Sequence, residues 1–476
     1  MQIQTSALAD APLLAVVLTE GDLTVPAALD EAFGGALSQL VESEKFKAKA
    51  GSSLTVRGMG AVSNAWVGLF GAGEGDAEGL RKAAGAASNF ARSKSLTGLS
   101  LQVPGGDAKA AEAIGEAIVT GNYRYERYLP EARQTKPLEA VSVTGLGDTT
   151  GLDAGVALGT ARSLARDLIN EPPADIYPET LAAAATKLST DRLQVEVWGP
   201  DRLESWGAVG TLAVGRGSSR TPRLVHMTYT PAGESQGTIA LIGKGVTFDA
   251  GGLSIKPSAG MVTMKCDMGG AAAVVGVMSA LEKLGVNVTV HGIFAAAENM
   301  LGADAYKLGD VLRYRNGKTV EIHNTDAEGR LLLADCLCYA SEMDEVTHIV
   351  DLATLTGAAV VALGEKYTAL YANEQDFADT LLASAKESGE GLWQMPLEND
   401  YNALLKADIA DIKNVGGRAA GSITAALYLQ NFVAEGKTWA HLDIAGPAFL
   451  SKPTEHLDKG GAGPQVVTLL NWLRSL

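Results

Sequence analysis

A stretch with two acidic residues and one basic residue, each two positions apart, has the types and spacing to do chemistry. Asp326, Glu328 and Arg330 lie two residues apart within Asn324-Thr325-Asp326-Ala327-Glu328-Gly329-Arg330-Leu331. On an extended backbone, side chains at this spacing point the same way, so the two carboxylates would be close together. Such charges repel unless one takes a proton or a cation lies between them. A plainer alternative is a helix start, where acids complement the dipole and Arg330 is an ion-pair partner.

A second group of charged residues lies upstream, among glycines that let the backbone approach a ligand closely. Its members are Lys244, Asp249, Lys256 and Asp267. Taken singly, each aspartate could serve as a turn or N-cap residue and each lysine as surface charge. That explanation is weaker for all four together, given that Asp326 and Glu328 fall in a similar setting.

The combined set of four carboxylates favours hard divalent cations. Cysteine and histidine ligands at zinc spacing are missing nearby, and the chain has no His-Glu-x-x-His motif. An oxygen-rich set of this kind suits hard cations. Four carboxylates can hold two ions if some bridge, and paired ions suit hydrolysis of a stable bond. A phosphate-binding loop is disfavoured, because Gly237 and Lys244 have the wrong spacing and Gly245 replaces the required Ser or Thr.

Alternating strands and helices must position these residues. Strands are predicted at 195–198, 223–227, 238–242, 286–297, 346–352 and 439–444, with helices at 268–284, 377–388 and 423–434. A hairpin is predicted around Asn316-Gly317, just before the acidic pair. This alternation favours a central, mostly parallel sheet covered by helices on both faces. Ligands collect at the carboxyl edge of such sheets, where we expect the charged loops to lie.

The chain length favours more than one α/β domain. We expect a small N-terminal α/β domain over residues 1–150, without chemistry, and a linker helix and turn over 151–178. Residues 179–476 are expected to form a larger C-terminal catalytic domain.

Bulk composition disfavours several classes of protein. The 476 residues carry a formal charge of −16, which disfavours binding to nucleic acid. The three cysteines speak for a reducing compartment, and Cys336 and Cys338 are expected to be packed helix thiols. We see neither a signal peptide nor an apolar run long enough to span a membrane, so a cytoplasmic location is expected.

Both charged stretches resemble the leucyl aminopeptidase family, the cytosol aminopeptidases. The segment 324–331 matches the family signature as it stands, and segments 243–257 and 267–270 match its other half. Further agreement comes from 351–357 and 441–446. The resemblance covers most of residues 160–476, whereas the N-terminal part matches only in size and position.

The resemblance implies a metal-dependent aminopeptidase that acts on peptides with a free N-terminus. It implies two divalent ions, Mn²⁺ or Zn²⁺, held by Lys244, Asp249, Asp267, Asp326 and Glu328. Asp249 and Glu328 would bridge the ions. Lys256 would lie over the scissile carbonyl and stabilise the oxyanion, and Arg330 would hold a bicarbonate as general base. The family also implies a homohexamer in which the N-terminal domains help the contacts.

The resemblance further implies an apolar substrate pocket. Its lining would be Met264, Thr354, Gly357, Ala445 and Ala448. Methionine and small residues would suit leucine or another apolar residue at the substrate N-terminus. The alternative is that these are ordinary core residues.

Two other functions remain open at this point. The paired-ion site could hydrolyse phosphoesters, with Lys256 and Arg330 clamping the phosphate. The chain could instead have a non-enzymatic role as a DNA-binding or scaffold protein, but its acidic balance and complete set of ionisable residues argue against that.

Overall fold

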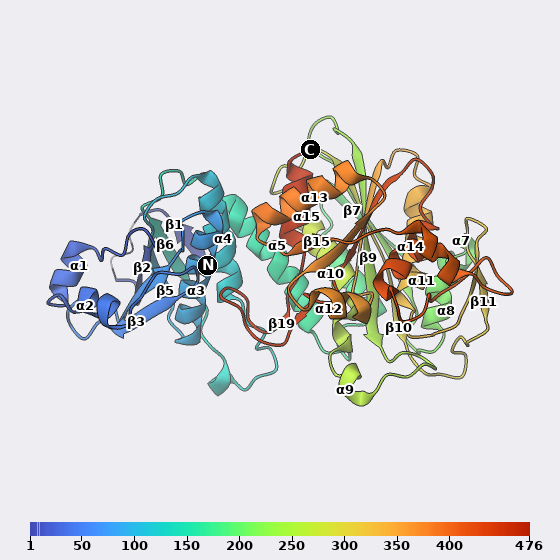
Figure 1. Ribbon diagram of the computed structural model, residues 1–476, viewed down its shortest axis with the longest axis horizontal. Coiled ribbons are helices and arrows are strands. Elements are labelled where there is room, and N and C mark those ends of the chain that lie inside the picture. The colour runs from blue at the N-terminus through green and yellow to red at the C-terminus, as the bar shows by residue number, and fades with distance from the viewer. Residues whose placement is uncertain (7, 9) are drawn as a thin grey trace. The chain divides into compact units, whose positions relative to one another are not determined.

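The structure, a computed structural model, describes residues 1–6, 8 and 10–476 (Figure 1). Its contacts divide the chain into two compact units. The first comprises residues 1–163 and 451–459, and the second comprises 164–450 and 460–476. The division falls within helix α5 (Leu152–Asn170). Among the described residues, no helix is both long enough and apolar enough to cross a membrane.

The first unit is built on a mostly parallel sheet. Its six strands, counted over the described residues, are in the order β1 (Gln2–Gln4), β6 (Ala140–Thr144), β5 (Gly98–Gln102), β2 (Leu13–Leu18), β4 (Trp66–Gly71) and β3 (Ser53–Arg57). Only the edge strand β3 pairs antiparallel. Helices α3 (Ala77–Ser93) and α4 (Ala108–Asn122) pack into the apolar core. None of the predicted site residues lies in this unit.

The second unit contains a larger central sheet. Within the described part of the chain its strand order is β15 (Leu392–Gln394), β14 (Thr368–Ala372), β17 (Thr438–Asp443), β13 (His348–Ala353), β9 (Thr238–Asp249), β10 (Thr289–Asn299), β8 (Arg223–Tyr229) and β7 (Leu193–Trp198). The four central strands, β17 to β10, run parallel, and antiparallel pairs flank them. The predicted fold class, a small α/β domain followed by a larger one with a largely parallel sheet, is confirmed.

Strand β9 extends further than the sequence predicts. It continues past Ile242 to Asp249, because β10 pairs with it along this length. Lys244 and Asp249 therefore lie in a strand, and the expectation that they occupy a loop is wrong. The glycines that suggested a loop serve close packing instead: a Cβ on Gly243 would lie 2.6 Å from the backbone of Ala271 in helix α10 (Gly269–Met278).

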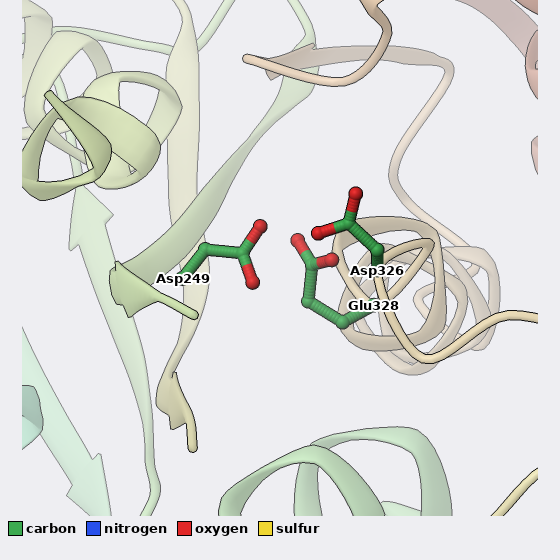
Figure 2. Close-up of side chains that lie close together, drawn as sticks. All are labelled: Asp249, Asp326 and Glu328. Atoms are coloured by element: carbon green, nitrogen blue, oxygen red, sulfur yellow. The ribbon is translucent and has the colours of Figure 1, made fainter. Parts of the chain in front are cut away.

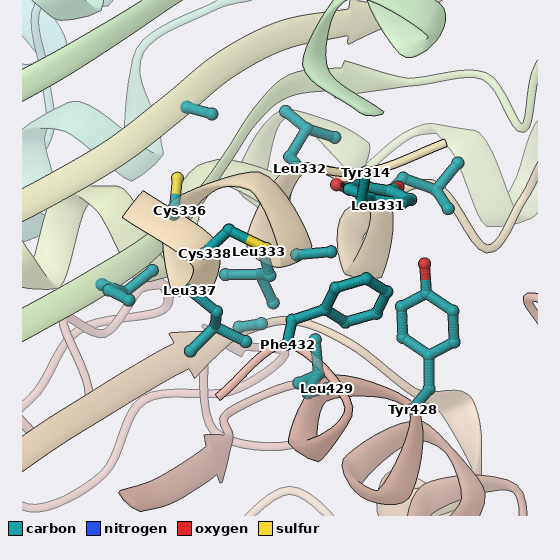
Figure 3. Packing of buried hydrophobic residues seen from close by; sticks show 14 of the residues in the cluster. Tyr314, Leu331, Leu332, Leu333, Cys336, Leu337, Cys338, Tyr428, Leu429 and Phe432 are labelled. Atoms are coloured by element: carbon teal, nitrogen blue, oxygen red, sulfur yellow. Dashed lines mark hydrogen bonds between the residues drawn. The ribbon is translucent and has the colours of Figure 1, made fainter. Parts of the chain in front are cut away.

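Helix α11 (Gly329–Ser341) follows the acidic stretch and packs into a large core cluster of the second unit (Figure 3). Leu331, Leu333 and Leu337 are fully buried, close to Phe432. Cys336 and Cys338 are free and buried, as predicted. The predicted hairpin is also present, as β11 (Val311–Arg313) paired antiparallel with β12 (Thr319–Glu321). The start of α11 is thus fixed by core packing, which holds the residues just before it.

Asp335 of α11 makes a pH-dependent contribution to stability. Burial raises its pKa to about 7, against hydrogen bonds from Thr211 that favour the carboxylate. Between pH 4 and 7 the folded chain keeps a proton that the unfolded chain has released, so the free energy of unfolding falls as pH rises. Because asparagine does not titrate, we expect Asp335→Asn to remove this decrease in stability with rising pH. The free energy of unfolding of the variant minus that of the unsubstituted protein should therefore be larger at pH 8 than at pH 5, by roughly 3 kcal/mol.

Urea denaturation at pH 5 and pH 8 measures this difference. Asp344→Asn, at an exposed position just beyond the same helix, is the control and should show no such pH dependence. An Asp335→Asn effect that is equal at the two pH values would contradict the assignment.

Candidate metal centre

Three carboxylates converge in the second unit. Asp249 ends β9, Asp326 lies in the loop after β12, and Glu328 is the N-cap residue of α11. Figure 2 shows Asp249 pointing from one side toward Asp326 and Glu328 on the other, and oxygens of the three lie within 4.8 Å of one another. The pair does not meet through an extended backbone as predicted, because Glu328 has helical angles of φ −79° and ψ −38°. Strand β12 belongs to a small separate sheet, so Asp326 and Glu328 follow a strand outside the central sheet and meet Asp249 at the carboxyl end of β9.

Lys244 joins this cluster to a fourth carboxylate. Its Nζ lies 2.7 Å from Asp267 Oδ1 and 2.8 Å from Glu328 Oε1, and it donates a hydrogen bond of 2.9 Å to the Thr354 carbonyl. Asp267 lies in a short 3-10 helix, Met264–Met268, that leads into α10. The Lys244 side chain runs past the start of α11, since a Cβ on Gly329 would lie 2.6 Å from Nζ. A glycine at this position is therefore needed for Lys244 to reach Glu328.

Lys256 pairs with the two carboxylates that Lys244 does not contact. Its Nζ is 2.9 Å from Asp249 Oδ2 and 2.6 Å from Asp326 Oδ1. Carboxylates and ammonium groups therefore alternate through the cluster. The structure brings together all five predicted ligands and Lys256, although they come from separate parts of the chain.

The cluster contains carboxylate oxygens that need a further partner. Asp267 Oδ2 and Glu328 Oε2 are buried and accept no hydrogen bond from any described residue. Leaving a buried charged oxygen without a partner costs free energy. A divalent cation with oxygen ligands would satisfy both atoms. The residues present therefore fit divalent cations.

The pKa values reflect the crowding of charge. Burial is the main cause that raises the pKa of Asp249, Asp267 and Asp326, and the Glu328 carboxylate raises the first two further. Burial alone would lower the pKa of Lys244, but the surrounding carboxylates outweigh it and raise the pKa above its usual value. The four acids thus hold Lys244 as an ammonium by their charge. A cation bound among them would compete with protons for the same oxygens.

Asn414 was missed by sequence reasoning and holds the acidic loop in place. Its Oδ1 accepts from the backbone N–H of His323 at 2.8 Å, and its Nδ2 donates to the Asn324 carbonyl at 2.6 Å. The Asn414 carbonyl accepts from Arg330 Nη1 at 2.8 Å. Burial lowers the pKa of Arg330, whose guanidinium lies 5.8 Å from the Tyr428 ring. One fully buried asparagine therefore positions both the ligand loop and Arg330.

A second asparagine, also missed, orients a carboxylate. Asn299 Nδ2 donates to Asp249 Oδ1 at 2.8 Å and to the Thr325 carbonyl at 3.0 Å. Tyr306 donates to the same carbonyl at 2.7 Å. Asp249 is thereby tied to the residue that precedes Asp326. Such outer partners fix the orientation of ligands.

Only some of the residues predicted to line the substrate pocket have contacts that place them beside the carboxylate cluster. Its members are Met264, Thr354, Gly357, Ala445 and Ala448. Thr354 donates from Oγ1 to Asp267 Oδ1 at 2.7 Å, so its hydroxyl supports the cluster. A Cβ on Gly269 would lie 3.5 Å from Thr354 and 3.7 Å from Ala448, which places these two residues beside the cluster. Gly357 lines a cavity of about 670 Å³ that also reaches Asp326.

Asp443 supports the remaining loops near the cluster. Its carboxylate accepts from Ala445 N at 3.2 Å, from Leu355 N at 3.1 Å and from Thr356 Oγ1 at 2.6 Å. It thus connects the ends of the neighbouring strands β17 and β13. Met264 is half-buried at the start of its 3-10 helix.

Family models match both parts of the chain. The model of the cytosol aminopeptidase family, catalytic domain, matches residues 163–470, and that of the N-terminal domain matches residues 15–131. The chain belongs to the cytosol aminopeptidase family. A probable cytosol aminopeptidase of Aquifex aeolicus is 40% identical, covering 97% of this chain and 94% of the relative. One from Picosynechococcus sp. is 42% identical, covering 96% and 95%.

Solved structures agree with this membership. The bottromycin maturation enzyme BotP in complex with Mn has a TM-score of 0.87 at 36% identity, covering 98% of this chain and 99% of that one. A mutant tomato leucine aminopeptidase has a TM-score of 0.89 at 32% identity, covering 100% and 96%. As a member of the cytosol aminopeptidase family, the protein is a metal-dependent aminopeptidase, a hydrolase that acts on peptides.

Proposed function

We propose that this cytosol aminopeptidase removes leucine and other apolar residues from the free N-terminus of peptides, using two divalent cations, Mn²⁺ or Zn²⁺. The observation that carries the proposal is the meeting of four carboxylates and two lysines, with buried oxygens that lack a partner. The proposed ligands are Lys244, Asp249, Asp267, Asp326 and Glu328. Asp249 and Glu328 would bridge, since both lie at the centre of the charged cluster.

The cations would supply Lewis acidity, which lowers the pKa of water and polarises the scissile carbonyl. Lys244 can coordinate only as a neutral amine, so it must release its proton when the site is loaded. Its burial favours that loss, and the carboxylates that hold the ammonium oppose it.

Lys256 is proposed to stabilise the oxyanion. Burial alone would lower its pKa, but Asp249 and Asp326 outweigh burial and raise it, so the side chain stays charged. A fixed ammonium beside the reacting carbonyl stabilises charge that develops in the transition state.

Arg330 is proposed to hold a bicarbonate that acts as general base. Its Nη1 is bound by Asn414, whereas its Nε has no hydrogen-bond partner among the described residues. A buried guanidinium with a free donor suits a small planar anion. The apolar substrate pocket is proposed to be lined by Met264, Thr354, Gly357, Ala445 and Ala448. We also propose a cytoplasmic homohexamer.

Chelation tests the proposed metal dependence. We expect a strong chelator to abolish release of leucine from a leucyl dipeptide, and we expect Mn²⁺ to restore it, because the buried carboxylates need a counter-cation for catalysis. Metal content per chain, measured alongside leucine release, should approach two ions when activity is full. A phosphoester substrate is the negative control. Activity that is indifferent to chelation would remove the cations from the mechanism.

A further inference from the structure

The cavity of about 670 Å³ that begins at Asp326 has an unusual distribution of charge. Most of its lining is apolar or small, from helix α12 (Gly357–Leu363), helix α14 (Gly421–Gln430) and the loop before α14. The charged side chains in the lining are Asp326, Arg330 and Arg418. Asp326 of the acidic cluster and Arg418 of the loop before α14 thus line the same cavity from different segments of the chain.

The two arginines differ in how they are engaged. Arg330 is 6% exposed, donates to the Asn414 carbonyl and lies against Tyr428. Arg418 is exposed, and within the described residues it makes no hydrogen bond or ion pair. Its guanidinium is therefore available to a ligand in the cavity. In a chain with a net charge of −16, an arginine that lines a cavity without an acidic partner calls for an explanation.

The loop that carries Arg418 is anchored at both ends. Asn414, just before it, holds the loop of the proposed ligands through Asn324. At the other end, a Cβ on Gly421 would lie 3.3 Å from the Ala358 side chain in α12. The loop therefore spans from one wall of the cavity to the other, and Arg418 lies between two fixed points.

We propose that Arg418 binds a carboxylate on the part of the substrate beyond the cleaved bond, and that this carboxylate is the C-terminus of a dipeptide. The inference rests on the proposed function and adds that the N-terminal amine of the substrate lies at the acidic cluster. A dipeptide is a short zwitterion, so it matches a cavity with acidic groups at one part and a free guanidinium at another. Arginine can bind a carboxylate with two parallel hydrogen bonds. An acidic side chain on the second residue is the other source of the same chemistry.

Four substrates distinguish these sources: Leu-Gly, its amide Leu-Gly-NH₂, Leu-Glu-NH₂ and Leu-Gln-NH₂. For the unsubstituted enzyme we expect kcat/KM to be higher for Leu-Gly than for Leu-Gly-NH₂. In Arg418→Gln this ratio should fall by about 10- to 100-fold, the size expected for a hydrogen-bonded charge pair. The change should appear mainly in KM, because the contact is the same in the ground and transition states. For Arg418→Lys the ratio should lie between those of the unsubstituted enzyme and Arg418→Gln. Lysine keeps the positive charge but cannot form two parallel hydrogen bonds to a carboxylate.

Arg313→Gln, at an exposed arginine in strand β11, is the matched control and should leave the ratio unchanged. An unchanged ratio in Arg418→Gln overturns the proposal. So does a loss confined to Leu-Glu-NH₂ relative to Leu-Gln-NH₂, which would assign the carboxylate to a side chain. If the unsubstituted enzyme released leucine from none of the four substrates, the proposed function itself would be contradicted.

Discussion

Glu328→Ala is expected to lower kcat by roughly 10³-fold or more and to lower the cation content of the purified protein. Loss of an outer partner of a metal ligand already costs ~10- to 100-fold in affinity or activity, and loss of a bridging ligand should cost more. Glu328 is 1% exposed, and its Oε2 has no hydrogen-bond partner among the described residues. Removing this side chain would deprive both proposed cations of a ligand. Leucine release and metal content per chain measure the two effects together.

Unfolding has to be separated from loss of the ligand. Glu328→Ala leaves Lys244 with one fewer buried partner, which is destabilising. The near-isosteric Glu328→Gln keeps the volume and a carbonyl oxygen, so it should fold while still losing activity. Glu345→Ala, at a glutamate whose side chain is 59% exposed, is the control. Retention of two ions per chain in both Glu328 variants would refute the bridging role.

Lys256→Gln is expected to lower kcat by ~10²- to 10³-fold, the usual size for one donor to an oxyanion. The cation content should be retained, because Lys256 is not among the proposed ligands. KM should change less than kcat if the contact forms mainly in the transition state. Steady-state kinetics on Leu-Gly with metal analysis of the same sample measures all three quantities.

The control for this variant is Lys307→Gln, at an exposed lysine. Loss of cations from Lys256→Gln would point to a different role. The lysine would then hold Asp249 and Asp326 in position for binding, and the assignment to the oxyanion would be wrong.

The charged residues of the site were accessible from sequence because their types are unusual for their setting. The sequence predicts a site for divalent cations from lysines and aspartates that lie among glycines and from Asp326 and Glu328, without knowledge of the fold. The backbone conformation of these residues could not be predicted from the sequence. Pairing with β10 draws Lys244 and Asp249 into a strand, and core packing of α11 gives Glu328 helical angles. Both effects depend on contacts distant in the chain, which local patterns do not contain.

The supporting asparagines illustrate the same limit. Asn299 ends a buried strand and Asn414 follows the short strand β16 (Ile412–Lys413), positions where asparagine has no distinctive spacing. Their importance comes from hydrogen bonds to Asp249 and to the backbone of Asn324, which only the tertiary structure brings within reach. The unpaired Arg418 was missed for a related reason, since the absence of an acidic partner cannot be seen in a sequence.

The alternation of ammonium and carboxylate groups around Lys244 and Lys256 has a consequence for how the fold tolerates four clustered carboxylates. Each buried acid already has a cationic neighbour supplied by the chain itself. Small zinc domains fold only when the ion binds, because metal binding supplies their folding free energy. Here the polypeptide itself supplies two ammonium groups to four carboxylates, which offsets part of the repulsion among them.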